Sequence, residues 1–218
     1  MAETLEELAA VAAGCTECRL CEGRTNVVFG AGNPQAQVMI VGEGPGEQED
    51  IQGLPFVGRS GQLLTQLLGE VGMERDDVYI ANVVKCRPPG NRDPRPDEIE
   101  ACKGYLKEQL RLIDPAVVIT LGNFSSKLLL STTTGITRLR GQAYPWWRRW
   151  LVPTFHPAAA LRGNPQVMAA MREDLQRVVA LIEQGPPAQE PATEAQAAVD
   201  ESRADDVDED TEQLGLFG

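Results

Sequence analysis

Four short apolar segments set the limits on how this 218-residue chain can fold. They are residues 37–42 (QVMIVG), 78–83 (VYIANV), 116–121 (AVVITL) and 151–155 (LVPTF). All four are rich in valine, isoleucine or leucine, and the first three do not alternate strictly between apolar and polar side chains. That pattern is typical of strands that are covered on both faces. We therefore predict four buried strands.

Segments with helical periodicity separate several of these strands, at residues 60–71, 96–113, 123–130 and 166–183. Strands that alternate with helices indicate a parallel sheet between helical layers. We expect an α/β fold with three layers, α/β/α, around a central four-stranded parallel sheet. The functional site of such a fold lies at the carboxyl ends of its strands. The residues that come after each strand are therefore the first candidates for function.

The ends of the chain differ from this central part. Residues 1–14 (MAETLEELAAVAAG) have no basic segment, so they do not resemble a secretory signal. Thr4 and Glu7 have the spacing of a capping box, and Gly14 comes next as a stop, so we predict an amphipathic helix here. The chain has no run of eighteen apolar residues, which argues against a membrane span. Together these features predict a cytoplasmic protein.

Most of the negative charge lies at the C-terminus. Residues 183–218 hold eleven acidic residues and one arginine, whereas the net charge of the whole chain is −12. The rest is nearly neutral, so the charge does not argue against a nucleic-acid partner. We predict a folded domain over residues 1–184 and a disordered acidic linker over residues 185–211. Residues 212–218 regain apolar character and form a separate terminal peptide.

The segments after the strands carry the residues that could form a site. Residues 42–50 (GEGPGEQED) are rich in glycine and acidic residues, which argues against a phosphate-binding loop. Phe56 lies in the same loop region, whereas Asn82 and His156, the only histidine, come at the ends of other strands. An aromatic ring can stack on a base, and an asparagine amide can both donate and accept hydrogen bonds. The expected pocket suits a planar, hydrogen-bonding heterocycle.

These motifs together resemble the family 4 uracil-DNA glycosylases. The resemblance is carried by EGPGE at residues 43–47, PFVG at 55–58, Asn82 followed by KCRPP at 85–89, and FHPA at 155–158. It covers residues 10–181. It implies an enzyme that flips uracil out of DNA and hydrolyses the N-glycosidic bond. The product is an abasic site, which starts base excision repair.

The resemblance also implies roles for single residues. Phe56 would stack on uracil, Asn82 would pair with N3 and O4, and His156 would stabilise the departing base through O2. Gly42 and Gly44 would line the pocket. Better-known uracil glycosylases carry an aspartate where this chain has Gly44, so Glu43 and Glu49 become the candidates for positioning water or offsetting the charge of the sugar. The alternative for either glutamate is that it only holds the loop by hydrogen bonds.

Two further segments are candidates for contact with DNA. Leu161 and Arg162 could fill the gap that the flipped base leaves, although Leu161 could instead pack at the start of a helix. Residues 137–151 (TRLRGQAYPWWRRWL) form the densest basic and aromatic stretch. Its arginines could contact phosphates, or the stretch could be an edge hairpin with a solvated charged face.

Three of the five cysteines lie within residues 15–21 (CTECRLC). The resemblance implies that Cys15, Cys18, Cys86 and Cys102 bind a [4Fe–4S] cluster, which takes four thiolates. Cys21 could replace Cys15 or Cys18, because C-x2-C-x2-C also occurs in ferredoxins. Four cysteines would suit zinc as well. A cluster here would tie the N-terminal helix to the loop over residues 87–96, in a structural role.

The terminal peptide resembles the QLxLF motif with which bacterial repair proteins bind the DNA sliding clamp. Its matching residues are Gln213, Leu214, Leu216 and Phe217. We expect a bacterial, nucleoid-associated monomer whose partners are uracil-containing DNA and this clamp. The alternatives are a non-catalytic DNA-binding relative with the same fold and cluster, a relative trapped covalently on the abasic sugar through an added histidine, and a redox regulator.

Overall fold

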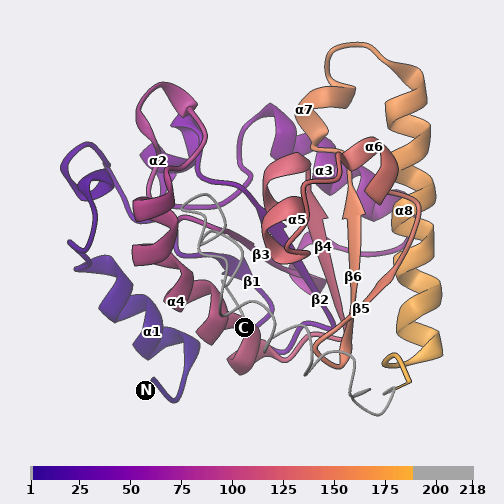
Figure 1. The fold of residues 1–218 in the computed structure, drawn as a ribbon, viewed down its shortest axis with the longest axis horizontal. Helices are drawn as coiled ribbons and strands as arrows, with labels where there is room; N and C mark the ends of the chain where they lie inside the picture. The colour runs from indigo at the N-terminus through magenta and orange to yellow at the C-terminus, as the bar shows by residue number, and fades with distance from the viewer. Residues whose placement is uncertain (1, 189–218) are drawn as a thin grey trace, which may run out of the picture.

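The computed structural model describes residues 2–188, so most of the acidic linker and the whole predicted clamp peptide lie outside the described residues. A six-stranded sheet lies between helical layers (Figure 1). Its strands are β1 (Ala31–Gly32), β2 (Val38–Gly42), β3 (Tyr79–Asn82), β4 (Val117–Leu121), β5 (Tyr144–Trp146) and β6 (Arg149–Thr154), in the spatial order β1-β3-β2-β4-β6-β5.

The four inner strands are the four that the apolar segments predict, and they run parallel. The strand number of the expected sheet is wrong, because β1 and β5 add two antiparallel edges. Neither edge strand has an apolar run: β1 is two residues long, and β5 contains Pro145. Proline is tolerated at a sheet edge because its missing N–H faces no neighbouring strand there.

Helices follow most strands and begin where the sequence supplies caps. Pro96 and Pro165 stand in the first turns of two long helices, and Thr4 accepts a hydrogen bond from the backbone N–H of Glu7. The α-helices are α1 (Leu5–Ala13), α2 (Glu47–Gln52), α3 (Arg59–Glu70), α4 (Pro96–Ile113), α5 (Asn123–Leu129), α6 (Ile136–Leu139), α7 (Pro157–Ala160) and α8 (Pro165–Gln184). The 3-10 turns are η1 (Arg19–Glu22), η2 (Arg75–Asp77) and η3 (Pro89–Asn91).

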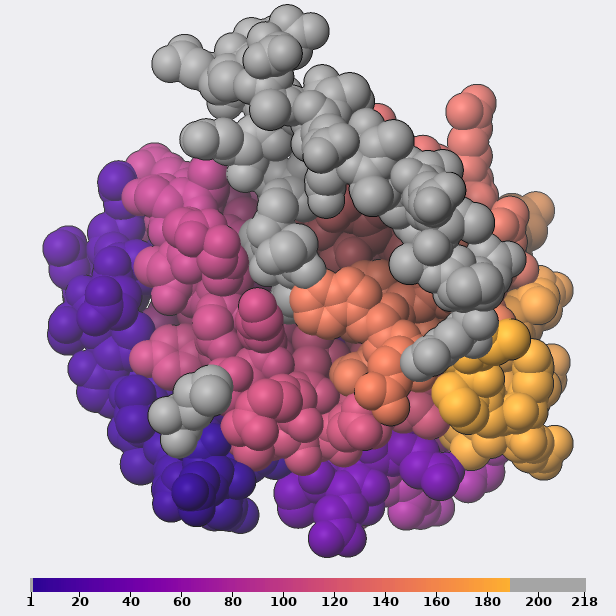
Figure 2. All heavy atoms as spheres, turned by 60° about the horizontal axis from the view of Figure 1, so that its bottom comes forward, coloured from indigo at the N-terminus to yellow at the C-terminus, as the bar shows by residue number. Residues whose placement is uncertain are grey.

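Each face of the sheet has its own apolar core. One core joins the sheet to α4 and α5 through residues such as Leu106, Leu110 and Leu129. The other joins it to α3 and α8 through residues such as Leu67 and Leu175. α1 packs against α4 on one flank, and α8 lies on the opposite flank (Figures 1 and 2). This arrangement confirms the expected three layers. No described helix has the length and apolarity that crossing a bilayer requires.

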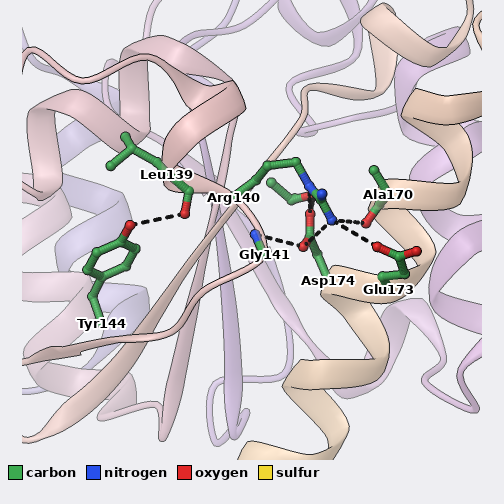
Figure 3. A network of polar contacts seen from close by, with 8 residues as sticks. Leu139, Arg140, Gly141, Tyr144, Ala170, Glu173 and Asp174 are labelled. Atoms are coloured by element: carbon green, nitrogen blue, oxygen red, sulfur yellow. Dashed lines mark hydrogen bonds and ion pairs between the residues drawn. The ribbon is translucent and has the colours of Figure 1, made fainter.

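The basic and aromatic stretch begins in α6, and from Tyr144 on it forms the edge hairpin of β5 and β6, which is one of its two expected structures. Figure 3 shows Arg140 reaching Asp174 on α8, to which it donates two hydrogen bonds of 2.8 and 3.0 Å. Asp174 is 1% exposed and also accepts from Thr154 Oγ1 at 2.6 Å. Arg149 is bonded to Asp114 and to the carbonyl of Leu110. Arg140 and Arg149 therefore act inside the fold, where they join helices to the end strands, and do not serve as free phosphate ligands.

Candidate active site

A cavity of about 540 Å³ opens at the carboxyl ends of the parallel strands. It is lined by residues that come after β2, β3 and β6, together with the start of α3 and the loop before α4. The predicted site residues Glu43, Gly44, Glu49, Phe56, Asn82, His156 and Arg162 all line it. The structure thus brings together side chains that lie more than 100 positions apart in the sequence, because parallel strands end at one edge of the sheet.

Asn82 lies at the end of β3 and is 1% exposed. Its side-chain Oδ1 is buried and has no hydrogen-bond partner among the described residues. Gly42 stands directly beside it in the β2–β3 register, and a Cβ at that position would lie 2.3 Å from Oδ1. Gly42 therefore keeps the space next to this amide open. An unpaired buried acceptor costs about 1–3 kcal/mol, so a ligand that donates to Oδ1 would recover that energy.

Phe56 forms one wall of the cavity. Its backbone has φ = 52°, a left-handed conformation that is strained for an aromatic residue. Two contacts hold this conformation. Arg75 donates a hydrogen bond to the carbonyl of Pro55, and Gly61 on α3 sits against the carbonyl of Phe56, where a Cβ would be only 1.7 Å away. The ring is thereby fixed 5.8 Å from the ring of His156.

His156 caps the N-terminus of α7, where its Nδ1 accepts a hydrogen bond from the backbone N–H of Ala158 at 3.2 Å. A nitrogen that accepts carries no proton, so the neutral ring has its proton on Nε2. Burial lowers the pKa of His156 below its ordinary value; the nearby Glu49 carboxylate opposes this shift, and Arg162 adds to it. The imidazole is thus a neutral Nε2–H donor at pH 7.

The titration of His156 can be read directly, because it is the only histidine in the chain. We expect its ring-proton NMR signal to titrate with a pKa below 6.5 in the folded protein. A depressed pKa means that the neutral form is stabilised on folding, so this contribution to stability is present above pH 6.5 and is lost as the pH falls through the folded value. Urea denaturation of the wild type and His156→Gln at about pH 5 and about pH 7.5 checks the stability change. A His156 pKa above 6.5 would contradict the assignment of a buried neutral ring.

The two candidate glutamates have different surroundings. Glu49 Oε1 accepts hydrogen bonds from the backbone N–H groups of Val57 and Gly58, both at 3.0 Å, so it holds the loop that carries Phe56. Its other oxygen lies close to Gly46, which also lines the cavity. Glu43 is half-buried, and burial followed by the nearby Asp93 carboxylate raises its pKa to about 7.

Asp50, in the same acidic segment, is an anchor and does not line the cavity. Its carboxylate is buried and accepts hydrogen bonds from the backbone N–H groups of Thr25 and Asn26. The residues of the acidic segment therefore have two different roles. Asp50 ties α2 to the segment before β1, whereas Glu43 and Glu49 line the cavity.

Residues at the mouth of the cavity include some that the sequence indicated and some that it did not. Leu161 directly follows α7 and is 38% exposed, so it does not pack in a core. Asp93 and Arg92, from the loop between β3 and α4, line the cavity and were missed. They stand ten and eleven residues after Asn82, so their place in the loop after that strand is the sequence signal that indicates them.

A second, smaller cavity lies between the segment after α1, the loop after β3 and α4, and all five cysteines line it. Cys15, Cys18 and Cys21 come from the segment after α1, Cys86 from the loop after β3, and Cys102 from α4. Arg24 donates a hydrogen bond to Cys86 Sγ at 3.3 Å, and the backbone N–H of Lys85 donates to Cys102 Sγ at 3.2 Å. The structure therefore gathers the four predicted ligands, and Cys21 with them.

The chemistry of this donor set fits an iron–sulfur cluster. Burial raises the pKa of Cys102 to about 11, so only a bound positive charge would keep that buried sulfur as a thiolate. Hydrogen bonds to the sulfurs are a usual feature of cluster sites. Within residues 2–188, no three His, Cys, Asp or Glu side chains stand close enough to hold one metal ion. A [4Fe–4S] cluster does not need that closeness, because each thiolate binds a different iron.

Comparison with known proteins agrees with this geometry. A family model described as the uracil DNA glycosylase superfamily matches residues 29–176. The chain is 46% identical to the type-4 uracil-DNA glycosylase of Sulfurisphaera tokodaii, over 81% of this chain and 84% of that one. It is 45% identical to the type-4 enzyme of Thermotoga maritima, over 77% and 89%. It is also 36% identical to a DNA polymerase of Bacillus phage SP01, over 71% of this chain but only 17% of the polymerase. The chain therefore belongs to the uracil-DNA glycosylase superfamily, among its type-4 members.

Proposed function

We propose that this protein is a uracil-DNA glycosylase, which removes uracil from DNA and leaves an abasic site for base excision repair. The observation that carries the proposal is the buried, unpartnered Oδ1 of Asn82 beside the ring of Phe56. Uracil offers an N3–H donor to this oxygen and an O4 acceptor to the amide NH₂. Cytosine has the opposite pattern at both atoms, so it would leave the amide unpaired.

The base must leave the duplex to reach this cavity, because the sheet edge cannot approach a stacked base. Phe56 stacks on the flipped uracil, and its strained backbone holds the ring in place before the base arrives. Leu161 and Arg162 enter the DNA duplex and fill the space that the flipped base leaves. Leu161 is an exposed apolar side chain and Arg162 is a cation, and both properties suit this role. Gly42 and Gly44 let the base approach the backbone of the loop after β2.

His156 stabilises the leaving group. As the C1′–N1 bond breaks, negative charge develops on the uracil, and the neutral Nε2–H group donates a hydrogen bond to O2. A donor that is already oriented before the reaction stabilises such charge by several kcal/mol. The sugar becomes positively charged at the same time, and the carboxylates Glu43 and Glu49 lie in the same cavity to offset that charge and to orient the attacking water.

The cysteine site would hold a [4Fe–4S] cluster through Cys15, Cys18, Cys86 and Cys102. When bound, the cluster contributes structure: it cross-links the segment after α1, the loop after β3 and α4. That loop carries Arg92 and Asp93 to the mouth of the cavity, so the fold beside the DNA depends on the cysteines. Cys21 is left as the fifth thiol, outside the ligand set.

The remaining proposals concern the C-terminal peptide, which lies outside the described residues, and the oligomeric state and location of the protein. Gln213, Leu214, Leu216 and Phe217 would bind a DNA sliding clamp, and the acidic linker would tether the enzyme to it. The monomeric state and the bacterial cytoplasmic, nucleoid-associated location stay predictions from the sequence.

A glycosylase assay tests the proposed function. We expect the purified protein to release uracil from a labelled oligonucleotide with one U·G pair, so that alkali cleaves the strand at that site, and to leave a matched T·A oligonucleotide intact. Binding without cleavage, in protein shown to contain iron, would favour the non-catalytic DNA-binding alternative. Cleavage of both substrates would contradict the proposed reading of the base by Asn82.

A further inference from the structure

Lys85 is the one buried lysine of the chain. The sequence has four lysines, and Lys85 is 1% exposed, whereas Lys103, Lys107 and Lys127 are half-buried or exposed. A lysine is almost never fully buried unless its charge is paired. Within residues 2–188, no ion pair joins Lys85 to a carboxylate. Because such burial costs free energy, it indicates a specific task for this ammonium group.

The side chain of Lys85 folds back onto the end of β3. Its Nζ donates a hydrogen bond of 2.7 Å to the backbone carbonyl of Asn82 and one of 2.6 Å to Oε1 of Gln109 on α4. Nζ also lies over the ring of Phe29, 6.0 Å from the ring centroid. The ammonium group therefore has two neutral oxygen acceptors and an aromatic ring around it.

The surrounding elements hold Lys85 in this place. Gln109 is buried, and its Nε2 donates a hydrogen bond to the backbone carbonyl of Phe29 at 2.8 Å. The backbone N–H of Lys85 donates to Cys102 Sγ at 3.2 Å, and its carbonyl accepts from the N–H of Val28 at 2.8 Å. Since α4 and the segment before β1 both hold the residue, its ammonium group has a fixed position.

The hydrogen bond from Lys85 fixes the peptide unit between Asn82 and Val83. The carbonyl of this unit accepts from Lys85 Nζ, and its N–H donates to the carbonyl of Gly42 on β2 at 3.0 Å. A peptide unit is planar, so hydrogen bonds at both ends fix its plane. That plane sets the direction in which the side chain leaves the Cα of Asn82. The position of the Asn82 amide, whose Oδ1 is buried without a partner among residues 2–188, therefore depends on Lys85.

We propose that Lys85 is a positioning residue for Asn82: by holding the Asn82 carbonyl, it keeps the side-chain amide where it pairs with N3–H and O4 of uracil. The inference rests on the proposed glycosylase activity. Lys85 lines the cysteine cavity and not the uracil cavity, so it acts through Asn82 without touching the base. A displacement of about 1 Å in a group that orients the substrate can slow a reaction about 100-fold.

The test is a double-mutant cycle of Lys85→Met and Asn82→Ala, measured as single-turnover excision of uracil from a duplex. Methionine is long and apolar, so it removes Nζ but keeps the site filled. We expect Lys85→Met to lower the maximal rate about 10- to 100-fold with Asn82 present, but less than about threefold in the Asn82→Ala background. The enzyme concentration that gives half the maximal rate, which reports DNA binding, should change less than about twofold.

A purely structural role of Lys85 would give a different result. It would lower the melting temperature or the fraction of active protein, and the rate would fall by the same factor in both backgrounds. Equal factors in the two backgrounds, or an unchanged rate in Lys85→Met, would overturn the inference. A wild type that excises no uracil would instead count against the proposed function itself.

Lys103→Met is the matched control, because it removes a lysine ammonium group from α4, where Lys103 pairs with Glu100 at 2.6 Å. Lys103 lines neither the uracil cavity nor the cysteine cavity. The control should excise uracil at the wild-type rate, and a loss as large as that of Lys85→Met would overturn the inference. Iron is measured in each variant, so that damage to the cysteine site is separated from a displaced amide.

A second pair of variants keeps Lys85 and decides the inference even if Lys85→Met fails to fold. Gln109→Glu and Gln109→Met both lose the donor to the Phe29 carbonyl, but only glutamate keeps an oxygen acceptor for Lys85 Nζ. Gln109→Glu should excise uracil at least about threefold faster than Gln109→Met, and this difference should vanish in the Asn82→Ala background. Equal rates of the two Gln109 variants would overturn the inference.

Discussion

Replacing Asn82 with alanine should slow single-turnover excision of uracil by about 100- to 1,000-fold. The change removes the acceptor for N3–H and the donor to O4, both within a buried site. Each such hydrogen bond is worth about 1–3 kcal/mol when its partner would otherwise stay unpaired, and about 1.4 kcal/mol corresponds to a factor of ten in rate. The side chain is 1% exposed, so water does not replace it easily.

The measurement is the rate of alkali-sensitive strand formation, with enzyme in excess over a uracil-containing duplex. Asn33→Ala is the control, since the one hydrogen bond of the Asn33 side chain within residues 2–188 is accepted from the backbone N–H of Gln35, in a turn before β2. The control should excise at the wild-type rate. A loss of less than about tenfold in Asn82→Ala, in protein with an unchanged melting temperature, would mean that another group reads the base.

Replacing Cys102 with serine should remove iron from the protein and lower its free energy of unfolding by more than about 4 kcal/mol, the range in which loss of a bound metal group falls. Cys102 lies on the inner side of α4, and its Sγ accepts a hydrogen bond from the backbone N–H of Lys85. Without a cluster, the segment after α1 and the loop after β3 lose their link to this helix.

Cys21→Ser is the matched control for this prediction, because Cys21 lines the same cavity but lies outside the proposed ligand set. It should keep four irons and four acid-labile sulfides per chain and melt as the wild type does. Loss of iron in Cys21→Ser with retention in Cys18→Ser would exchange the two residues in the ligand set. Zinc in place of iron and sulfide, in protein purified without oxygen, would refute the cluster.

Some features of this fold can be predicted from local pattern. The apolar runs before Gly42, Asn82, Leu121 and Phe155 place the four inner strands, because a strand covered on both faces has to be apolar throughout. The edge strands have no such requirement. β1 and β5 exist because their backbone groups pair with β3 and β6, and that pairing leaves little trace in their own side chains.

The same contrast holds for the site. Phe56, Asn82 and His156 could be found from the sequence, since each stands in a loop at the same end of a parallel sheet and their motifs resemble a known family. The geometry of these three side chains could not be predicted from the sequence. The left-handed backbone of Phe56 depends on contacts from Gly61 and Arg75, which belong to other elements.

The sequence by itself determined the order of strands and helices and the residue types at the strand ends, because hydrophobic periodicity and short motifs are local properties of the chain. The tertiary structure alone decided which groups carry a charge, which accept a proton and which are already occupied. Glu43 and Asp93, fifty residues apart in the chain, line one cavity, Arg140 is bound by Asp174, and Glu49 holds the Phe56 loop. Burial and through-space electrostatics depend on distances that only folding sets.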